Sequence, residues 1–221
     1  MNILALETAT DACSVAVVTS AGVFDEHVIA PRRHTELLFA MINRVMAAAG
    51  IARHALDLIA CGQGPGAFTG VRIAAAAAQG IAAAHDLPVA PVSSLAALAA
   101  GGARCFGATQ VVAAIDARRS EIYASGWRFP RDEGRPRCVF ADCLIAPAAL
   151  MVSAPSEWLA VGNAWSVYAA AFNPALATMP RAPLMYPHAR DVAHIAALMH
   201  ARGETVSALA VAPFYLRGAL D

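Results

Sequence analysis

The hydrophobic pattern of the N-terminal part of the chain predicts three short strands and a helix. Residues 2–7 are largely apolar, residues 13–19 alternate between apolar and polar positions, and residues 23–30 are more polar, as an edge strand would be. Apolar residues then recur at helical spacing over 35–49, and Gly50 stands where helices commonly end. The chain therefore opens with an antiparallel meander that leads into a helix.

An alternation of strands and helices follows, which predicts that the next strands pair in parallel. Strands are expected at 57–62 and 87–92, and helices at 70–84 and from 93 to about 100. Three meandering strands before such an alternation are the element order of one lobe in the superfamily of actin, sugar kinases and Hsp70. We therefore predict an α/β protein with a two-lobed actin-like ATPase (ASKHA, RNase H-like) fold, in which mixed sheets are flanked by helices.

The pair Gly101-Gly102 predicts a boundary between an N-terminal lobe of residues 1–102 and a smaller C-terminal lobe of residues 103–221. The last helix could pack back on the first lobe. Elements expected in the second lobe are strands at 110–116, 121–129, 137–141 and 158–162 and helices at 147–151, 165–172 and 191–202.

Composition narrows the classes of protein to which the chain can belong. It is 58% hydrophobic and 14% charged, with a formal net charge of zero and a mean hydropathy of +0.53. A neutral chain has no overall attraction for nucleic acid or anionic lipid, so any contact with nucleic acid would be local or made through a partner. The apolar surplus, much of it alanine, suggests that part of it faces a partner protein.

Targeting and redox signals predict a cytoplasmic protein without membrane contact. The five cysteines form no CxxC pair, as in reduced cytosolic proteins. The N-terminus lacks a basic region and soon reaches Glu7, which argues against a signal peptide. The uncharged stretch 158–180 is interrupted by glycine, asparagine and proline, which disfavours a membrane span.

The stretch Gly64-Pro65-Gly66-Ala67-Phe68-Thr69-Gly70, here called the glycine loop, lies between a predicted strand and a predicted helix. The unpaired N–H groups at such a helix start can hold an anion. The loop is not a Walker motif, which needs a lysine after its last glycine, because all 16 basic residues of the chain are arginines. A phosphate or partner site and a tight turn that packs the helix on the sheet both remain open at this point.

Catalytic and metal-binding patterns are sparse. No two of the seven histidines have the i, i+4 spacing that places two ligands on one helix face, and there is no GxSxG motif. Cys61 lies in an apolar strand, where a thiol is ordinarily inert. Acid–base or phosphoryl chemistry would have to use Glu7, Asp11 or Asp116. Alternatively, Glu7 is a turn carboxylate held by the threonines that follow it, and Asp116 forms an ion pair between the lobes.

Two helices carry apolar faces that a partner could cover. The helix at 70–84 has small residues on one face, which lets a second helix approach closely. The helix at 35–49 has a wide apolar stripe, as expected for a helix that touches a sheet and something else. Two such pairs would make a four-helix bundle; the alternative is that both stripes face their own sheet. The side chains predicted at a partner interface are Leu37, Leu38, Met41, Ile42, Val45, Val71, Ala74, Ala75 and Ala78.

Several motifs, taken in their order along the chain, point to a family. They are ILALETAT at 3–10 with CSVAV at 13–17, GPGAFTGVRIA at 64–74, DARRSEIYA at 116–124 and PFYLR at 213–217. In these motifs the chain resembles the TsaB family, formerly called YeaZ. The family usually has Asp at the position of Glu7, Ser at that of Ala67 and Gly at that of Ala74. These departures make independent nucleotide chemistry less expected.

The resemblance implies a bacterial cytosolic protein in the pathway that places N6-threonylcarbamoyladenosine at position 37 of tRNAs reading codons that begin with A. Members of the family are non-catalytic partners of TsaD, a paralogue that carries an HxxxH metal site and transfers the threonylcarbamoyl group. TsaE supplies an ATPase, and TsaC makes the threonylcarbamoyl-adenylate. Family members pair with TsaD, or with themselves as homodimers, through helices of the first lobe, and tRNA is reached indirectly through the complex.

We therefore expect a pseudo-enzyme that binds and activates TsaD, with no metal and no cofactor of its own, so that ATP or ADP would bind only in the assembled complex. Residual nucleotide contact would involve Glu7, Thr8, Gly64, Gly66, Thr69 and Gly70. The alternatives are a small ATP-dependent phosphotransferase-like enzyme that uses the same region, and a glycoprotease-like peptidase.

Overall fold

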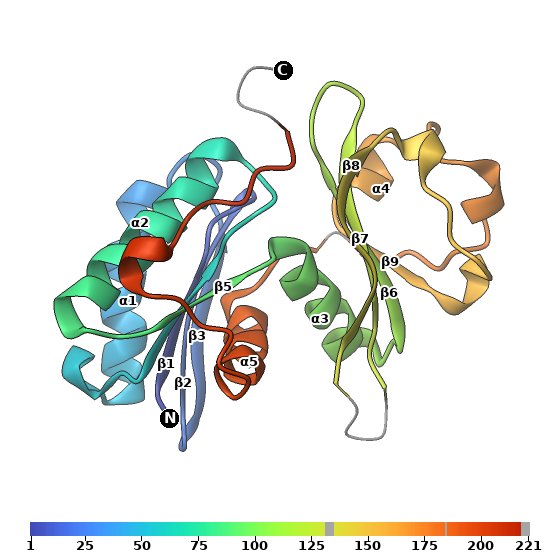
Figure 1. Ribbon diagram of the computed structural model, residues 1–221. Coiled ribbons are helices and arrows are strands. Elements are labelled where there is room, and N and C mark those ends of the chain that lie inside the picture. The colour runs from blue at the N-terminus through green and yellow to red at the C-terminus, as the bar shows by residue number, and fades with distance from the viewer. Residues whose placement is uncertain (131–134, 184, 218–221) are drawn as a thin grey trace. The chain divides into compact units, whose positions relative to one another are not determined.

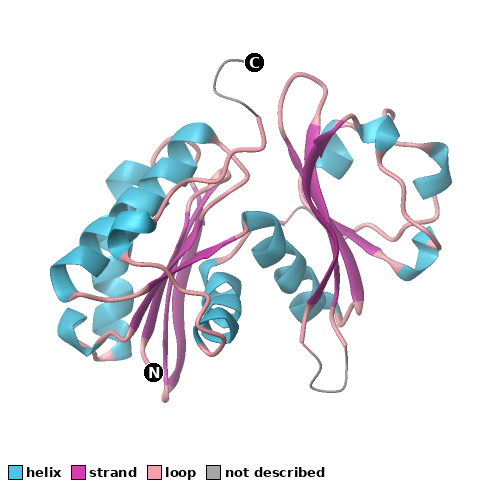
Figure 2. Cartoon of the chain, viewed as in Figure 1, coloured by secondary structure: helices cyan, strands magenta, loops and turns pink. Residues whose placement is uncertain are grey.

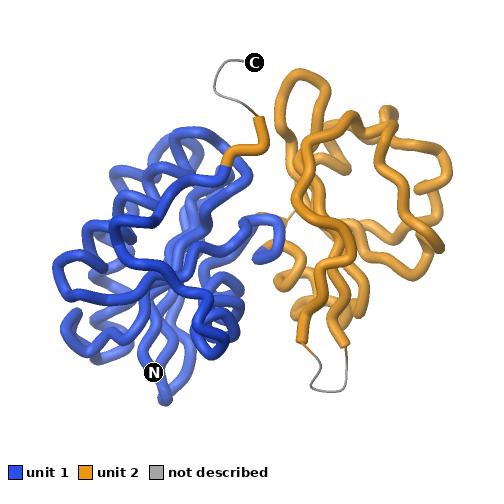
Figure 3. Tube along the Cα trace, viewed as in Figure 1, with its two compact units in different colours: residues 1–97, 187–214 blue, residues 98–186, 215–221 orange. Residues whose placement is uncertain are grey.

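The computed structural model describes residues 1–130, 135–183 and 185–217. It contains two compact units, which Figure 3 colours separately. Unit 1 comprises Met1–Ala97 and Pro187–Phe214, and unit 2 comprises Leu98–Tyr186 and Tyr215–Asp221. The chain thus leaves unit 1 after Ala97, returns to it at Pro187 for its last α-helix, and passes to unit 2 again after Phe214.

Unit 1 is built on a five-stranded mixed sheet in the order β3-β2-β1-β4-β5. The strands are β1 Ile3–Glu7, β2 Ala12–Thr19, β3 Gly22–Ile29, β4 Leu58–Gly62 and β5 Val89–Val92. The first three strands pair antiparallel, and β4 pairs in parallel with both β1 and β5. This confirms the predicted meander followed by parallel strands, and it places Glu7 at the carboxyl end of β1 opposite Ser14.

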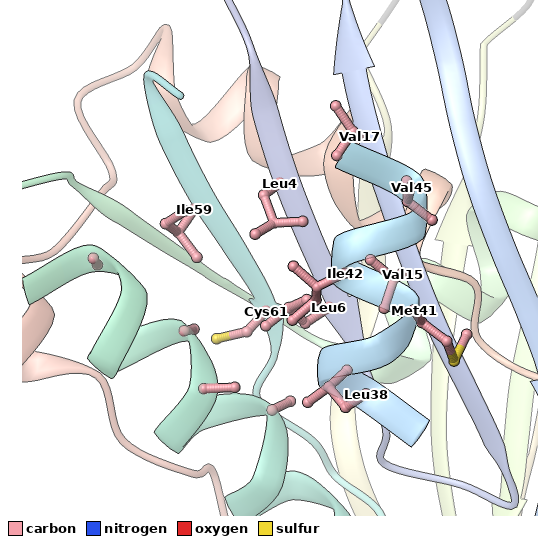
Figure 4. Close-up of a cluster of buried hydrophobic side chains, with 14 of the residues drawn as sticks. Leu4, Leu6, Val15, Val17, Leu38, Met41, Ile42, Val45, Ile59 and Cys61 are labelled. Atoms are coloured by element: carbon pink, nitrogen blue, oxygen red, sulfur yellow. The ribbon is translucent and has the colours of Figure 1, made fainter. Parts of the chain in front are cut away.

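Helices cover both faces of this sheet (Figure 1 and Figure 2). α1 His34–Ala49 and α2 Phe68–His85 lie on one face, and α5 Ala189–His200 lies on the other with the start of α3 Ser94–Phe106. Leucine, isoleucine, valine and methionine side chains fill the space between the sheet and α1 (Figure 4). α1 ends at Gly50, whose φ of 66° lies in the left-handed region that glycine adopts without strain.

Unit 2 holds a four-stranded mixed sheet in the order β8-β7-β6-β9. β6 Gln110–Asp116, β7 Ile122–Arg128 and β8 Arg137–Ile145 are antiparallel neighbours, and β9 Leu159–Val161 pairs with β6 in parallel. The core of unit 2 includes a stacked aromatic pair, Trp165 and Phe172. The short helical segments of the chain are η1 Arg53–Ala55, η2 Pro147–Ala149, η3 Pro155–Glu157, α4 Ala164–Val167, η4 Pro174–Leu176 and η5 Ala208–Ala210.

Some predicted limits in the second half of the chain are wrong. α3 runs on through Gly101 and Gly102, where the sequence predicted a boundary. A Cβ at Gly102 would lie 2.8 Å from Cγ1 of Val161, so this glycine lets α3 pack closely on the unit 2 sheet. The predicted helix at 165–172 is the single turn α4, and the one at 147–151 is the 3-10 turn η2.

The units also differ from the predicted division of the chain after residue 102. They are joined inside α3, between Ala97 and Leu98, and the segment Pro187–Phe214 with α5 belongs to unit 1. In both units helices flank a mixed sheet, as the predicted actin-like fold requires. Within the described part of the chain, no helix combines the length and the apolar character that a bilayer span would need.

Candidate functional site at the glycine loop and helices α1 and α2

Glu7, the last residue of β1, is completely buried. Its Oε1 accepts a hydrogen bond from the backbone N–H of Ala9 at 2.6 Å, and its Oε2 accepts one from the Ser94 hydroxyl at 2.8 Å. Burial raises the pKa of this carboxyl, and the hydrogen bonds, one of them from the Thr8 backbone, oppose that rise. A Cβ at Gly62 would clash with Oε2, so glycine is required on the neighbouring strand. Glu7 is therefore a structural carboxylate of unit 1.

The glycine loop packs against the turn between β1 and β2. The Ala67 N–H donates to the carbonyl of Ala9 at 2.7 Å, and the Thr8 hydroxyl donates to the carbonyl of Gly70 at 2.6 Å. A Cβ at Gly66 would clash with the Ala9 carbonyl, and one at Gly70 would clash with the Thr8 carbonyl. The glycines thus allow two backbone segments to touch, which is the role of a packed turn.

The same loop is tied to two segments that are distant in sequence. Gly64 has a φ of 96°, and its carbonyl accepts a hydrogen bond from the Ser94 N–H at 2.8 Å. The Gln63 carbonyl accepts one from the Phe214 N–H, also at 2.8 Å. One network therefore joins β1, the glycine loop, α3 and the C-terminal segment of unit 1. It contains Glu7, Thr8, Gly64, Gly66 and Gly70 of the residues predicted for nucleotide contact, whereas Thr69 is exposed.

The apolar stripes of α1 and α2 face the sheet of unit 1, which corrects the predicted partner contacts. Leu37 is only half-buried, and it packs against the core. Figure 4 shows side chains of α1 among those of the strands, such as Leu6 and Val15. Helical periodicity identifies an apolar face without saying what covers it, and here the strands cover it. The other eight predicted interface residues are buried in unit 1, namely Leu38, Met41, Ile42, Val45, Val71, Ala74, Ala75 and Ala78.

The outward sides of α1 and α2 form a different surface, here called the outer helix face. The two helices contact each other on the same side of the sheet. Phe39 is 54% exposed, and Phe68 is 53% exposed with the Arg72 guanidinium 3.5 Å from the centre of its ring. Small residues predominate elsewhere on this face. Its exposed positions are Glu36, Phe39, Ala40, Asn43 and Ala47 on α1 and Phe68, Thr69, Arg72, Ala76, Gly80 and Ala83 on α2.

In unit 2, the turn after β6 holds Asp116 and a strained backbone. Residues 118–120 all lie in the left-handed region, with φ values of 64°, 53° and 60°. The Asp116 Oδ1 accepts hydrogen bonds from the Arg118 N–H and the Tyr168 hydroxyl, both at 2.7 Å, and its Oδ2 lies 3.0 Å from the Arg118 guanidinium. The bond to Asp116 raises the pKa of the Tyr168 hydroxyl.

Arg217, from the closing motif, braces the same turn. It donates to the carbonyl of Ala117 at 3.0 Å and forms a salt bridge with Glu121. The partners of Asp116 and Arg217 given above all belong to unit 2. The ion pair of Asp116 is therefore formed with Arg118 inside unit 2, and not between the lobes as in the alternative that the sequence offered.

Nucleophile and metal chemistry find little support in the described residues. Burial raises the pKa of the Cys61 thiol to about 12 and that of the Cys13 thiol to about 11, so both remain protonated near neutral pH. Within residues 1–130, 135–183 and 185–217, no group of three or more His, Cys, Asp or Glu side chains is placed to hold a metal ion.

Comparison with known proteins identifies the family. The family model described as TsaD, tRNA N6-adenosine threonylcarbamoyltransferase, matches residues 18–209. The tRNA threonylcarbamoyladenosine biosynthesis protein TsaB of Escherichia coli K12 is 36% identical over 221 residues, which cover 98% of this chain and 95% of that protein. The chain belongs to the TsaB (YeaZ) family.

Further relatives of the TsaB family agree. The protein of the same name from Haemophilus influenzae is 33% identical over 98% of this chain and 94% of its own length. The solved structure of YeaZ from Pseudomonas aeruginosa has a TM-score of 0.87 at 36% identity, covering 97% of this chain and 100% of that one. A second structure from Pseudomonas aeruginosa, described as similar to peptidase YEAZ, has a TM-score of 0.90 at 38% identity, covering 98% and 99%. These matches confirm the predicted family and its actin-like fold.

Two features of the site escaped the sequence analysis of this TsaB-family chain. The sequence placed Ser94 only in a helix that starts near residue 93, but its hydroxyl donates to Glu7, and Ser93 accepts a hydrogen bond from the Ala96 N–H at 3.1 Å. The outer helix face was also missed. Its one sequence signal is the spacing of Ala76 and Gly80, small residues four apart on α2.

Proposed function

We propose that this chain is a non-catalytic subunit that binds and activates a TsaD-type transferase in the formation of N6-threonylcarbamoyladenosine at position 37 of tRNAs reading codons that begin with A. The observation that carries the proposal is the similarity along 98% of the chain to an Escherichia coli protein named for threonylcarbamoyladenosine biosynthesis. TsaE and TsaC would act in the same pathway. The complex would be cytoplasmic and would bring tRNA to the chain indirectly.

The chemistry around the glycine loop supports a role without catalysis. Both Glu7 oxygens and the Thr8 hydroxyl are engaged in hydrogen bonds inside unit 1. A metal ion or phosphate at this place would have to displace them, at a cost of about 1–3 kcal/mol for each buried polar group left without a partner. We propose that the chain has no cofactor of its own, and that ATP or ADP reaches the exposed Thr69 end of the loop only in the assembled complex.

The outer helix face is the proposed binding surface for TsaD. The match to the TsaD family model includes α1 and α2, so a TsaD chain would present an equivalent helix pair. Ala76 and Gly80 permit close approach of a second helix, and Phe39 supplies an exposed aromatic anchor of the kind enriched in protein interfaces. Two helices from each partner would then pack as a four-helix bundle. Without TsaD, a second copy of this chain would occupy the same face as a homodimer.

The test is association of the full chain with the TsaD protein of its own host, measured by sedimentation velocity. Ala76→Arg places a long charged side chain on the outer helix face and should weaken association at least about tenfold, because a desolvated unpaired charge is costly in an interface. Ala148→Arg, at an exposed position of η2 in unit 2, is the matched control and should leave association unchanged. Equal association of both variants would place the interface elsewhere.

A second measurement separates the subunit role from an ATP-dependent enzyme. The isolated chain is titrated with ATP and Mg²⁺ in a calorimeter, and phosphate release is followed in parallel. We expect neither micromolar binding nor turnover by the isolated chain. Micromolar binding with turnover that Glu7→Gln abolishes would overturn the non-catalytic assignment even if the chain also bound TsaD.

A further inference from the structure

Two histidines that neither the glycine loop nor the outer helix face uses are stacked within unit 1. His27 lies on β3, opposite Ser14 of β2, and His188 is the residue immediately before α5. Their ring centroids are 4.5 Å apart and their planes differ by 12°. The pair therefore joins β3, the edge strand of the sheet, to the start of α5, the helix on the face of the sheet opposite α1.

The hydrogen bonds of His188 define its protonation state. Its Nδ1 accepts from the Arg190 N–H at 3.3 Å, which makes His188 the N-cap of α5, and the Ser14 hydroxyl lies 3.3 Å from the same nitrogen. Its Nε2 lies 3.2 Å from Asp25 Oδ2. An Nδ1 that accepts from the Arg190 N–H carries no proton, so this contact fits the neutral tautomer with its proton on Nε2. A proton added at Nδ1 would face the Arg190 N–H and remove the cap.

His27 is held neutral by a different cause. Its Nδ1 is buried and has no hydrogen-bond partner among the described residues. Burial lowers the pKa of His27, although the nearby carboxylates of Asp25 and Asp191 act in the opposite direction. A second positive ring stacked on His188 would add like-charge repulsion. The cap bond at Nδ1 of His188, the burial of His27 and the stacking thus favour uncharged rings, whereas the carboxylate of Asp25 acts against them.

The charged groups around the pair come from two elements. β3 contributes Asp25 and α5 contributes Asp191, whereas Arg190 meets the pair through its backbone N–H and β2 faces it with the uncharged Ser14. Glu26, next to His27, is paired with Arg44 of α1 at 2.8 Å. Of these acids, Asp25 and Asp191 act on the rings. They favour protonation of a ring, but a proton on Nδ1 of His188 would still break its cap bond with the Arg190 N–H.

We propose that His27 and His188 form a pH-sensitive clasp, which holds the start of α5 on β3 while both rings are neutral and releases it when mild acid protonates them. The clasp lies where the chain re-enters unit 1 at Pro187. Ser14 completes it, because its hydroxyl oxygen accepts a hydrogen bond from the Ala189 N–H at 3.0 Å. Release would therefore begin at the first turn of α5 and leave α1, on the other face of the sheet, in place.

The test combines histidine titration and hydrogen exchange on the full chain between pH 8 and pH 5. NMR of labelled histidine should show His27 titrating below about 6.5, the ordinary value. Protection factors of the amides at 189–193 should fall by several-fold more than those of α1 between pH 7.5 and pH 5.5, up to about tenfold for one proton taken up on opening. The double variant His27→Phe with His188→Asn should lose this difference, because it keeps an aromatic ring at position 27 and a cap acceptor at position 188 but cannot titrate.

The matched control is His54→Asn, an exposed histidine in η1, which should behave as the wild type. The clasp is refuted if His27 titrates at or above its ordinary value, if α5 and α1 lose protection equally, or if the double variant keeps the wild-type pattern. If the double variant fails to fold, the wild-type titration and the single variant His27→Phe test the clasp, because the single variant keeps the His188 cap of α5.

Discussion

At the scale of single residues, Glu7 at the end of β1 has a structural role. The position of Glu7 is one where a carboxylate could handle a metal ion, yet its two oxygens meet an amide and a hydroxyl of the same unit, and Gly62 makes room for it. Replacing either partner would leave a buried polar group unsatisfied, which is the more costly way to lose a hydrogen bond.

The first prediction concerns Glu7 itself. Glu7→Ala should reduce the free energy of unfolding by roughly 2–4 kcal/mol, because it leaves a cavity and two unsatisfied donors. Glu7→Gln should remain within about 1 kcal/mol of the wild type, because its amide can accept from Ala9 and donate to Ser94. Urea denaturation measures both, and equal losses in the two variants would contradict the hydrogen-bond assignment.

A comparison of the wild type with Glu7→Gln reports the direction of the pKa shift of Glu7. Burial raises the pKa of Glu7 in the folded state, so the folded state binds more protons than the unfolded state between the two pKa values. Wild-type stability should therefore fall, relative to Glu7→Gln, as the pH rises from about 4.5, the ordinary value of a glutamate. A difference between the two proteins that does not change from pH 4.5 to pH 8 would show that the folded-state pKa is not raised.

Backbone strain in the Asp116 turn gives a prediction for unit 2. Ser120 has a φ of 60°, which costs a non-glycine residue roughly 1–2 kcal/mol. Ser120→Gly should stabilise the chain by about 1 kcal/mol after the extra chain entropy of glycine is subtracted. The control is Ser207→Gly, where φ is −69° and the same replacement should destabilise by several tenths of a kcal/mol. Thermal unfolding compares them, and no gain at Ser120 would mean that the turn is not strained.

At the scale of elements, α1 has one face that is buried against the sheet and another that is exposed. Met41 is fully buried against the sheet, whereas Phe39, two residues earlier, is 54% exposed. Met41→Asp should therefore abolish cooperative folding, because it buries an unpaired charge, and Phe39→Asp should change stability by less than about 1 kcal/mol. Circular dichroism melts distinguish the two. A well-folded Met41→Asp chain would mean that the buried stripe is misassigned.

The same helix shows how far the sequence predicts the structure. The period of 3.6 residues predicted α1 and α2 closely, since apolar spacing is a local property of the chain. It could not tell which face the sheet covers, because the covering residues Leu6 and Val15 come from strands elsewhere in the sequence. The partner of Glu7 was hidden for the same reason, because Ser94 is 87 residues away along the chain. A boundary was predicted at Gly102 because the sequence does not distinguish a glycine that permits close helix packing from one that forms a turn.

At the scale of the whole molecule, unit 1 is completed by the last part of the chain. α5 buries Val192, Ala193 and Ala196 against the face of the sheet that α1 and α2 leave open. Beyond it, Val206 exchanges two backbone hydrogen bonds with Val89 of β5, at 2.9 and 2.8 Å. The N-terminal residues of unit 1 thus have an uncovered apolar face until residues 187–214 are present.

The last prediction follows from that dependence. A chain of residues 1–186 lacks α5 and the pairing with β5, so the apolar face formed by Ile3, Ala5 and Ala60 would meet water. At roughly 25 cal/mol for each Å² of exposed apolar surface, losing an entire covering helix is comparable to the 5–15 kcal/mol by which domains are stable. The truncated chain should therefore show no cooperative thermal unfolding. Addition of a 187–217 peptide should restore protection from hydrogen exchange in β1 and β4. If the truncated chain unfolds cooperatively and protects these strands without the peptide, the returning segment is dispensable for unit 1.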